Sequence, residues 1–373
     1  MNLTIDARLV NSSGIGVYIQ NVLKNEKLRN YQLKLLYKEP ESDFFKEIAA
    51  FAEMVAYNAA LYSVSELLNT PSKTTNTDIF WSPHFNVPII NFAKKLKVVT
   101  IHDAFHLAHY NTLSLTQKVY AKLMYKKAVT DSDIIFTVSE TSKNEIIKYT
   151  GASAEKIKVV YNGIDFAKFN ASLSIEAKTK VLNQYKINFP FVLFVGNVKP
   201  HKNLRHALLG FKEYLQNHST ADNNLKFVIV GKREGFITGD TSINTLVADS
   251  VLKEKVHFTD WVMHHDLPAL YQSAAAFVFP SFYEGFGFPP LEAMAAGCPV
   301  ISSNSSCMPE IYGSAALFFK PDETNQIAEA FHQILTDVQL RNSLITKGLE
   351  QSKKYNWHEA VDTKLDLFEQ MVK

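Results

Sequence analysis

The sequence predicts an α/β protein with two doubly wound domains, each built on a parallel sheet. Short apolar runs recur along the chain, and each is followed by turn residues and a longer helical pattern. Continuous apolar strands that alternate with helices are typical of parallel sheets covered on both faces. A length of 373 residues and an apolar content of 46% suit two sizeable cores. Strands are predicted at residues 3–7, 33–37, 78–82, 98–102, 134–139, 157–161, 191–196, 227–231, 256–258, 276–280, 299–301 and 315–319.

The domain boundary is expected between residues 165 and 190, where a polar, helix-like stretch follows the strands of the first half. We therefore expect an N-terminal domain at residues 1–180 and a C-terminal domain at 181–355. Ligands of open α/β sheets bind at the carboxyl ends of the strands, so the cleft between two such domains is the expected place for the chemistry.

Charge and composition exclude some function classes. The formal net charge is +2, with 22 basic against 17 acidic residues in 1–180 and 17 against 20 in the remainder. A nearly balanced charge without an aromatic-rich basic motif argues against nucleic-acid binding. The basic bias of the first half suits an anionic acceptor or a lipid surface, and it is also typical of an ordinary solvated exterior.

The sequence also bears on localisation. Residues 1–6 run straight into a strand-like segment, without the pattern of a signal peptide, and no apolar run reaches membrane-spanning length. We expect a cytoplasmic protein, and peripheral contact with the inner face of the membrane is left open. The helical segment with Lys118, Lys122 and Lys126 is basic and amphipathic, with Val119, Leu123 and Met124 on another face. It is a candidate for membrane or acceptor contact, or else a solvated face.

Metal and disulfide chemistry are not expected. Cys298 and Cys307 are the two cysteines, too few for a disulfide scaffold and without the spacing of a zinc site. We interpret both as reduced structural residues, and we expect neither a metal nor another resident cofactor.

Residues 281–300, SFYEGFGFPPLEAMAAGCPV, are the most informative stretch of the chain. Glu284 and Glu292 lie eight positions apart around a glycine-rich turn that opens a helix. Gly285 and Gly287 allow a ligand close to the backbone, and the amides of the helix start favour an anion such as phosphate. Carboxylates beside a phosphate need hydroxyl groups to bind, and sugars and riboses supply them. The stretch therefore predicts a sugar-nucleotide site.

The same string resembles the E-x7-E signature of the retaining glycosyltransferases of family 4, without a gap from Ser281 to Val300. The resemblance implies a GT-B fold, in which two Rossmann-like domains face each other across a cleft. It also implies that the first domain binds the acceptor and the second binds the nucleotide-sugar donor, and that the final helix, about residues 356–373, packs back on the first domain. Residues 5–8, 14–18 and 196–203 look most like mannosyltransferases of bacterial surface-polysaccharide assembly.

A second motif follows the predicted strand at 191–196. Gly196 opens a loop that carries Lys199 and Lys202 before a helix, an arrangement that can clamp a phosphate. An ammonium group at Lys202 would neutralise the β-phosphate as a point charge. Family 4 enzymes usually carry an arginine near the start of this loop, where this chain has Asn197. Either Lys199 or Arg205 could supply the second positive charge, and spacing does not choose between them.

The first half holds two further candidates. Gly14 and Gly16 form a glycine loop over a helix start, whose amides could touch the donor diphosphate. Ile19 stands where a dinucleotide fingerprint needs its third glycine, which argues against a dehydrogenase. His102 ends a buried strand, and the resemblance implies that it contacts the transferred sugar rather than acting as a general base. The neighbouring Asp103 is interpreted as a cap of the next turn.

The resemblance implies retaining transfer of a hexose, with mannose favoured, from a nucleotide sugar to a glycan or lipid-linked acceptor in polysaccharide or O-antigen synthesis. The implied reaction is a front-face transfer in which phosphate-binding groups stabilise the departing diphosphate. GDP-mannose is the favoured donor, with UDP- and dTDP-sugars open, and the base would be read around residues 259–262. The groups expected at the reacting centre are Glu284, His102 and Lys202, and those expected to bind the donor are Gly14, Gly16, Gly196, Lys199, Lys202, Glu284, Gly285, Phe286, Gly287, Phe288, Glu292 and Val262.

Three alternatives compete with this interpretation. Asp131-Ser132-Asp133 formally fits the Asp-x-Asp motif of metal-dependent transferases, although it precedes a strand instead of following one. A sugar-nucleotide epimerase or a phosphorylase could share the two-domain architecture. A binding protein that had lost turnover would keep the cleft, but the presence of both glutamates and the lysine argues against it.

Overall fold

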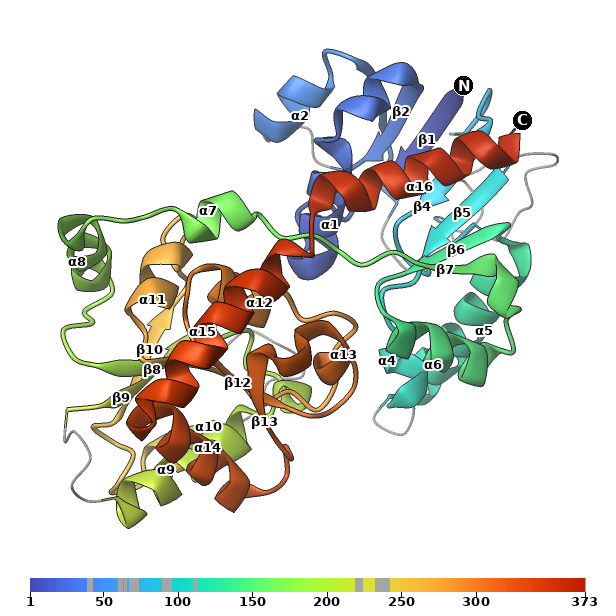
Figure 1. Ribbon diagram of the computed structural model, residues 1–373. Coiled ribbons are helices and arrows are strands. Elements are labelled where there is room, and N and C mark those ends of the chain that lie inside the picture. The colour runs from blue at the N-terminus through green and yellow to red at the C-terminus, as the bar shows by residue number, and fades with distance from the viewer. Residues whose placement is uncertain are drawn as a thin grey trace. The chain divides into compact units, whose positions relative to one another are not determined.

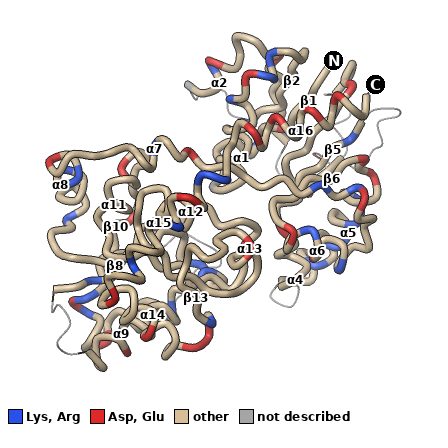
Figure 2. Tube along the Cα trace, in the orientation of Figure 1, with Lys and Arg blue, Asp and Glu red and all other residues tan. Residues whose placement is uncertain are grey.

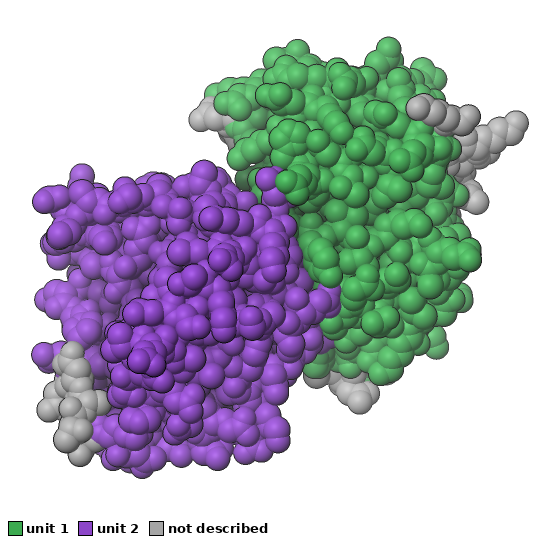
Figure 3. Space-filling view, viewed as in Figure 1, with its two compact units in different colours: residues 1–163, 357–373 green, residues 164–356 purple. Residues whose placement is uncertain are grey.

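The computed structural model describes residues 1–38, 43–59, 63, 66, 74–88, 96–109, 113–218, 224–231 and 242–372. The chain forms two compact units, Met1–Gly163 with Trp357–Lys373 and Ile164–Asn356 (Figures 1 and 3). The chain passes from unit 1 to unit 2 at residue 164 and returns after residue 356. These two connections lie side by side, because the amide of Ile164 donates to the carbonyl of Tyr355 at 3.0 Å.

The division falls earlier than the boundary expected near residue 180. Helices α7 (Phe166–Asn170) and α8 (Ile175–Gln184) both belong to unit 2. The side chain of Asn170 donates to the carbonyl of Ala295 at 3.0 Å, and Tyr185 donates to Asp266 at 2.6 Å. The sequence predicts the boundary within this polar stretch, whereas the side-chain contacts of Asn170 and Tyr185 fix the stretch to unit 2.

Unit 1 contains a parallel seven-stranded sheet in the order β3-β2-β1-β4-β5-β6-β7. Successive residues of each strand point to opposite faces, so both faces need a cover. Val98 packs into one core cluster with α1 and α16, while its neighbour Val99 packs into another with α5. The strands are β1 (Asn2–Asp6), β2 (Gln32–Tyr37), β3 (Ala52–Ala56), β4 (Ile79–Ser82), β5 (Leu96–Thr100), β6 (Ile134–Thr137) and β7 (Ile157–Val159).

The C-terminal helix α16 is part of unit 1. Phe368 packs edge-on against Trp81, with ring centroids 5.4 Å apart, and Asp362 accepts from the Asn25 side chain at 2.9 Å. Unit 1 thus closes its core with the last segment of the chain, as Figure 1 shows. The helices of this unit are α1 (Ser13–Leu23), η1 (Glu26–Asn30), α2 (Asp43–Ile48), α4 (Phe105–Ala108), α5 (Leu115–Asp131), α6 (Glu140–Thr150), η3 (Ala154–Lys156) and α16 (Trp357–Val372).

Unit 2 contains a parallel six-stranded sheet in the order β10-β9-β8-β11-β12-β13. Phe194 and Val278 face a core cluster shared with α9 and α14, whereas Phe277 packs against Tyr271 of α11 at 5.5 Å between ring centroids. The strands are β8 (Phe191–Val195), β9 (Lys226–Val230), β10 (Val256–Asp260), β11 (Ala276–Phe279), β12 (Val300–Ser303) and β13 (Ala316–Phe319). The remaining helices are η4 (Pro200–Lys202), α9 (Leu204–Asn217), α10 (Ser242–Val247), α11 (Leu267–Ser273), α12 (Phe288–Ala295), α13 (Met308–Tyr312), η5 (Gly313–Ala315), α14 (Thr324–Thr336) and α15 (Val338–Lys353).

Each predicted strand coincides with an observed one, and the fold class is confirmed. Strand β3 was missed because this edge strand mixes half-buried and exposed residues, with Glu53 among them, instead of forming an apolar run. Within the described ranges, no helix is long and apolar enough to cross a bilayer.

The basic bias of the first half largely disappears when charges are counted by unit. Unit 1 has 21 basic and 19 acidic residues because α16 adds four acidic side chains, and unit 2 has 18 of each. Basic and acidic residues alternate along both units (Figure 2). Any electrostatic attraction to a partner must therefore arise from local groups rather than from the net charge of a unit.

Candidate functional site

Two loops of unit 2 meet where the order of its strands reverses. The chain leads from β8 outward to β9 and β10, and from β11 outward to β12 and β13. Loops after β8 and β11 therefore lie together at the carboxyl edge of the sheet, where open α/β sheets bind ligands. Asn203 links them, because its side-chain amide donates to the carbonyl of Pro280 at 3.0 Å. A second link runs from the amide of Phe282 to the carbonyl of His201 at 2.8 Å.

Lys202 and Glu284 form an ion pair at this edge. The Lys202 Nζ lies 2.6 Å from Glu284 Oε1, and the side chains are 21% and 13% exposed. The loop that carries Glu284 is held in place by Ser306, whose hydroxyl donates to the Glu284 carbonyl at 2.8 Å. Both side chains keep some contact with solvent, so water can solvate either group when the pair separates.

The glycine-rich turn has a packing requirement of its own. Gly287 has a φ of +83°, and a Cβ there would lie 2.1 Å from the Tyr312 hydroxyl, which donates to the Gly287 carbonyl at 3.0 Å. Phe286 is buried and contacts Phe288 and Tyr355 with ring centroids 5.3 Å and 5.4 Å away. The turn is therefore rigid, and it delivers the chain into α12 at Phe288.

Glu292 lies on α12, against α11. The Tyr271 hydroxyl donates to Glu292 Oε2 at 3.0 Å. Burial raises the pKa of Glu292 to about 7, although the Tyr271 hydrogen bond and the charge of Lys168 oppose the shift. Lys168 is fixed nearby by its hydrogen bond to the carbonyl of His264, at 2.9 Å. Glu292 can thus change its charge near neutral pH.

The remaining residues expected around the donor lie on the same edge of unit 2 or on the loop after β10. Gly196 directly follows β8, and its amide donates to the Val230 carbonyl at 2.9 Å. Lys199 precedes η4 and is half-buried, while Arg205 is exposed on α9. Val262 is buried, but its neighbour Trp261 is 66% exposed. The structure does not choose between Lys199 and Arg205 as the second cation.

The glycine loop of unit 1 opens α1. Gly14 is exposed, and a side chain there would meet nothing within 4 Å. At Gly16 a Cβ would lie 2.5 Å from the Val10 carbonyl oxygen, so the residue is required by the close approach of the preceding loop. Close packing thus explains the glycine at position 16. At Gly14 the start of α1 has free space around it.

His102 follows β5 and is held as a neutral imidazole. Its Nε2 lies 2.9 Å from the carbonyl of Pro83, and a carbonyl can only accept, so Nε2 carries the proton. Burial lowers the pKa of His102 to about 4. The Nδ1 atom can then accept a hydrogen bond from a hydroxyl group. Asp103 accepts from the Phe105 amide at 2.9 Å, the turn cap that the sequence predicted.

Tyr18 connects His102 with the C-terminal helix. Its ring lies edge-on to His102 with centroids 4.8 Å apart, and Lys364 Nζ lies 5.3 Å from its centroid. Lys364 is fully buried on α16 and donates to the Ala360 carbonyl at 3.2 Å. Burial lowers the pKa of Lys364 to about 7. A buried amino group that loses its charge near neutral pH therefore lies one ring away from His102.

The Asp-x-Asp motif has structural partners. Asp131 ends α5 and pairs with Lys127, while Asp133 Oδ2 accepts from the Lys97 amide at 2.8 Å. Both residues precede β6, at the edge of the sheet opposite to the strand ends that carry His102. Over the described parts of the chain, no group of three or more His, Cys, Asp or Glu residues is placed to hold a metal ion.

The structure brings Lys202 and Glu284 into contact and places Glu292 on the adjoining helix. Gly14, Gly16 and His102 all lie in unit 1, where the Tyr18 ring on α1 contacts the His102 ring. Sequence reasoning missed the residues that hold these groups, because they lie far away along the chain and form no motif with them. These supporting residues are Asn203, Tyr271, Ser306 and Tyr312.

Two family models match the chain. The model described as "Glycosyltransferase Family 4" matches residues 12–168, and "Glycosyl transferases group 1" matches residues 177–351. The O-antigen chain mannosyltransferase RfbU of Salmonella typhimurium is 31% identical over 74% of this chain and 69% of its own length. The O-antigen chain mannosyltransferase B of Escherichia coli is 28% identical over 78% of this chain and 74% of its own length.

Solved structures share the fold. Anabaena Alr3699/HepE in complex with UDP superposes with a TM-score of 0.77 at 15% identity, over 99% of this chain and 100% of that chain. WaaG, a glycosyltransferase involved in lipopolysaccharide biosynthesis, superposes with a TM-score of 0.74 at 14% identity, over 98% and 99% of the two chains. Both likenesses extend over both units.

Proposed function

The chain belongs to the family 4 glycosyltransferases, with the GT-B fold, and we propose that it transfers mannose from GDP-mannose to a glycan or lipid-linked acceptor with retention of configuration. The names of the two O-antigen mannosyltransferases support mannose as the sugar and surface polysaccharide as the product. UDP- and dTDP-sugars are the competing donors, and Anabaena HepE was solved with UDP.

The Lys202–Glu284 ion pair is the observation that carries this proposal. A diphosphate placed at the carboxyl edge of β8 and β11 would attract the Lys202 ammonium group away from Glu284. The released carboxylate would then accept hydrogen bonds from sugar hydroxyls. The amides of residues 285–288 would bind phosphate oxygens at the start of α12, where the helix dipole favours negative charge. One exchange of partners thus couples diphosphate binding to sugar recognition.

Glu292 and His102 have supporting roles in this scheme. An ionised Glu292 accepts from the two ribose hydroxyls, and the Tyr271 hydroxyl orients its carboxylate from behind. His102 accepts from a hydroxyl of the transferred sugar through Nδ1, because Nε2 is committed to Pro83. A neutral histidine suits this role, since a positive charge would remove the acceptor.

Retention follows in this proposal from transfer on one face of the sugar. The departing diphosphate accepts the proton of the acceptor hydroxyl, while Lys202 and the backbone amides stabilise the charge that develops on phosphate. We propose that the reaction needs no metal ion. Activity would then survive EDTA, whereas loss of activity in EDTA and its recovery with a divalent cation would contradict this part of the proposal.

Product analysis tests the proposal. The protein is incubated with GDP-mannose, UDP-glucose or dTDP-glucose and with a mannose-terminated oligosaccharide, and the anomeric protons of the product are followed by NMR. GDP-mannose should give an α-linked mannoside, and Lys202→Met should abolish it. A β-linked product would exclude retention, and transfer from UDP-glucose alone would exclude mannose as the donor sugar.

We also propose that α5 contacts an anionic membrane. Leu115, Val119 and Leu123 are 81%, 58% and 63% exposed, and their spacing of four residues places them on one face. Lys122 and Lys126 are exposed on the same helix. Aliphatic side chains flanked by lysines suit the interface of an anionic bilayer. Met124, expected on the apolar face, is instead buried in the core.

Vesicle sedimentation tests this contact. The protein should bind vesicles that contain phosphatidylglycerol more tightly than pure phosphatidylcholine vesicles, and Leu123→Glu should remove the difference. Ile175→Glu is the matched control, because Ile175 is 77% exposed on α8 of unit 2. Equal binding by Leu123→Glu and the wild type would exclude α5 as the contact.

A further inference from the structure

We propose that unit 2 has a second binding site, a groove lined by α9, α14 and β13 that takes a chain of neutral sugars. The two helices lie side by side (Figure 1). They approach closely because Gly210 has no side chain, and a Cβ there would lie 2.6 Å from the Ile327 Cβ. The groove beside them has a volume of about 500 Å³. This volume lies within the range of about 300 to 1,000 Å³ that is typical of small-molecule sites.

The groove extends away from the proposed donor site. Lys202 lies two residues before the start of α9, whereas Asn217, which lines the groove, is the last residue of that helix. A helix of 14 residues is about 20 Å long, so the two side chains lie at opposite ends of α9. Along α14 the lining runs from Asn325 to Gln333, a rise of about 12 Å. A ligand in this groove and a nucleotide sugar at Lys202 can therefore bind at the same time.

The outer edge of β13 supplies backbone groups. This strand is the last of its sheet, and the Phe319 carbonyl accepts from the Asn304 amide at 2.9 Å, on the side of β12. The backbone groups of successive residues in a strand point to opposite sides, so the N–H and C=O of Phe318 point outward. Phe318 also lines the groove. The other residue with outward groups, Ala316, is buried, so this edge offers one donor and one acceptor rather than a site for a peptide strand.

The helices add side-chain donors and acceptors. Glu213 is half-buried, and its carboxylate has no hydrogen-bond or ion-pair partner among the described residues. Gln326 accepts from the Lys320 amide with Oε1 at 3.0 Å, which leaves its Nε2 to donate. Gln333 donates with Nε2 to Glu329 at 2.8 Å, which leaves its Oε1 to accept. The groove thus presents donors and acceptors next to each other along its length.

The lining selects the class of ligand. It includes Glu213 and Glu329 but neither Lys nor Arg, so a phosphate or a nucleotide would meet no opposite charge. Within the described ranges, no group of three or more His, Cys, Asp or Glu residues could hold a metal ion. Hydroxyl groups both donate and accept, and Leu317, Phe318 and Ala328 offer apolar contact to the C–H faces of sugar rings. If the proposed function is correct, the ligand is the glycan that the enzyme extends, and this clause alone depends on that function.

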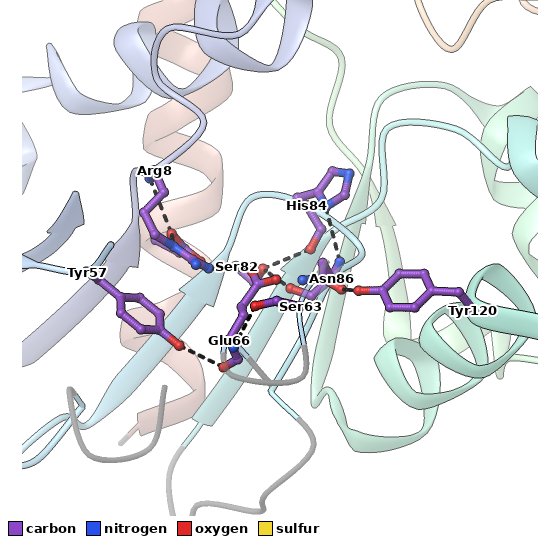
Figure 4. Close-up of polar contacts among 9 residues, drawn as sticks. Arg8, Tyr57, Ser63, Glu66, Ser82, His84, Asn86 and Tyr120 are labelled. Carbon is purple, nitrogen blue, oxygen red and sulfur yellow. Dashed lines mark hydrogen bonds and ion pairs between the residues drawn. The ribbon is translucent and has the colours of Figure 1, made fainter. Parts of the chain in front are cut away.

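The polar cluster at the strand ends of unit 1 shows the opposite arrangement. It lies where the strand order reverses between β1 and β4. Arg8 donates to Asp6 at 2.8 Å and to Glu66 at 2.7 Å, and Tyr120 donates to Asn86 (Figure 4). The charged groups of that cluster are paired with one another, whereas the half-buried carboxylate of the groove is left to a ligand.

NMR of alanine methyl groups in the full chain tests the groove directly. Ala328 and Ala330 line it, while Ala207 is fully buried on α9 and does not. With α-mannotriose as the probe, the methyl signals of Ala328 and Ala330 should shift until the site is saturated, and that of Ala207 should stay. Glu213→Met should weaken this binding about tenfold, which corresponds to about 1.4 kcal/mol, because one hydrogen bond to a carboxylate is lost.

Thermal unfolding of the same variant separates binding from folding. Glu213→Met should not lower the thermal midpoint, since the carboxylate it removes has no partner among the described residues. Gln216→Met is the matched control, because Gln216 is exposed on the same helix and does not line the groove. It should leave both the thermal midpoint and the affinity for α-mannotriose unchanged.

The results that would overturn the groove differ from those that would overturn the proposed function. Absence of saturable shifts at Ala328 and Ala330, or equal affinity in Glu213→Met and the wild type, would exclude the site. Larger shifts of these signals with inorganic phosphate or with spermine would identify a site for ions instead of sugars. None of these results depends on a donor, whereas failure of GDP-mannose to act as one would count against the proposed function and not against the groove.

Discussion

The two sheets reverse their strand order at equivalent places, but the charges at these places are arranged differently. In unit 2, Lys202 faces the single carboxylate of Glu284, and both side chains keep part of their exposure. In unit 1, Arg8 lies between Asp6 and Glu66, with side chains that are only 2%, 12% and 3% exposed. One edge holds a balanced pair near solvent, and the other holds a buried cluster with excess negative charge.

This difference teaches what each edge can bind. A partly exposed pair can release its cation to a diphosphate, because water can solvate the two groups while they separate. A buried cation between two carboxylates cannot be released, since breaking such a cluster leaves an uncompensated charge. The unit 2 edge is therefore suited to a charged ligand, whereas the cluster at the unit 1 edge is committed to its own ion pairs.

The largest expected effect is on stability. Arg8→Met should lower the free energy of unfolding by about 3 to 5 kcal/mol, because two buried carboxylates lose their cation. Lys202→Met should lower it by less, because only one carboxylate loses its cation and water can still reach it. Urea denaturation of both variants measures the contrast. Equal losses would show that the two ion clusters do not differ in the way described.

The next effect is on turnover. Glu284→Gln should lower kcat/KM for transfer by about 10²-fold or more, because the sugar loses its positioning carboxylate. Lys212→Met is the matched control, since Lys212 pairs with Asp249 at 2.7 Å in the same unit with similar exposure. Initial rates with the wild type and both variants suffice. Full activity in Glu284→Gln would remove Glu284 from the reacting centre.

A third effect is a pH dependence confined to unit 1. The pKa of Lys364 falls from its usual 10.5 to about 7 on folding, so above pH 7 the unfolded chain holds a proton that the folded chain has released. The stability contributed by this group therefore rises with pH, by up to about 1.4 kcal/mol per unit between pH 7 and 10. Denaturation at pH 7 and 9 should show this rise in the wild type and not in Lys364→Met. If the free energy of unfolding changes equally between pH 7 and pH 9 in the wild type and in Lys364→Met, Lys364 is not buried as a neutral amine.

The smallest expected effect concerns the nucleotide. With a pKa of about 7, Glu292 is ionised in about a tenth of the molecules at pH 6 and in about nine tenths at pH 8. If only the carboxylate binds the ribose, affinity for GDP should rise about ninefold over this range. Calorimetry at both pH values measures it, with Glu292→Gln as the control for titration of the phosphates. If the affinity for GDP changes by the same factor between pH 6 and pH 8 in the wild type and in Glu292→Gln, Glu292 does not bind the ribose as a carboxylate.

The sequence predicted the strands, and it singled out the candidate groups of unit 2, because these signals are local. Continuous apolar runs mark buried strands, and Glu284 with Glu292 lies within one motif of the chain. It did not predict β3, an edge strand without a fully buried residue or a continuous apolar run, or the placement of α7 and α8 in unit 2. The Arg8, Glu66 and Asn86 cluster was also missed. Its members are up to 78 positions apart along the chain, and only the order of β1 and β4 brings them together.

Thermal unfolding of the full chain with GDP, UDP, dTDP or ADP tests the central claim most directly, with Glu292→Ala measured alongside. A nucleotide present at about 100 times its dissociation constant should add about 2.7 kcal/mol to the free energy of unfolding. We expect GDP to stabilise the wild type, and we expect Glu292→Ala to lose that stabilisation. Stabilisation by none of the four nucleotides, or equal stabilisation of the variant, would contradict a nucleotide-sugar site at the edge of β8 and β11.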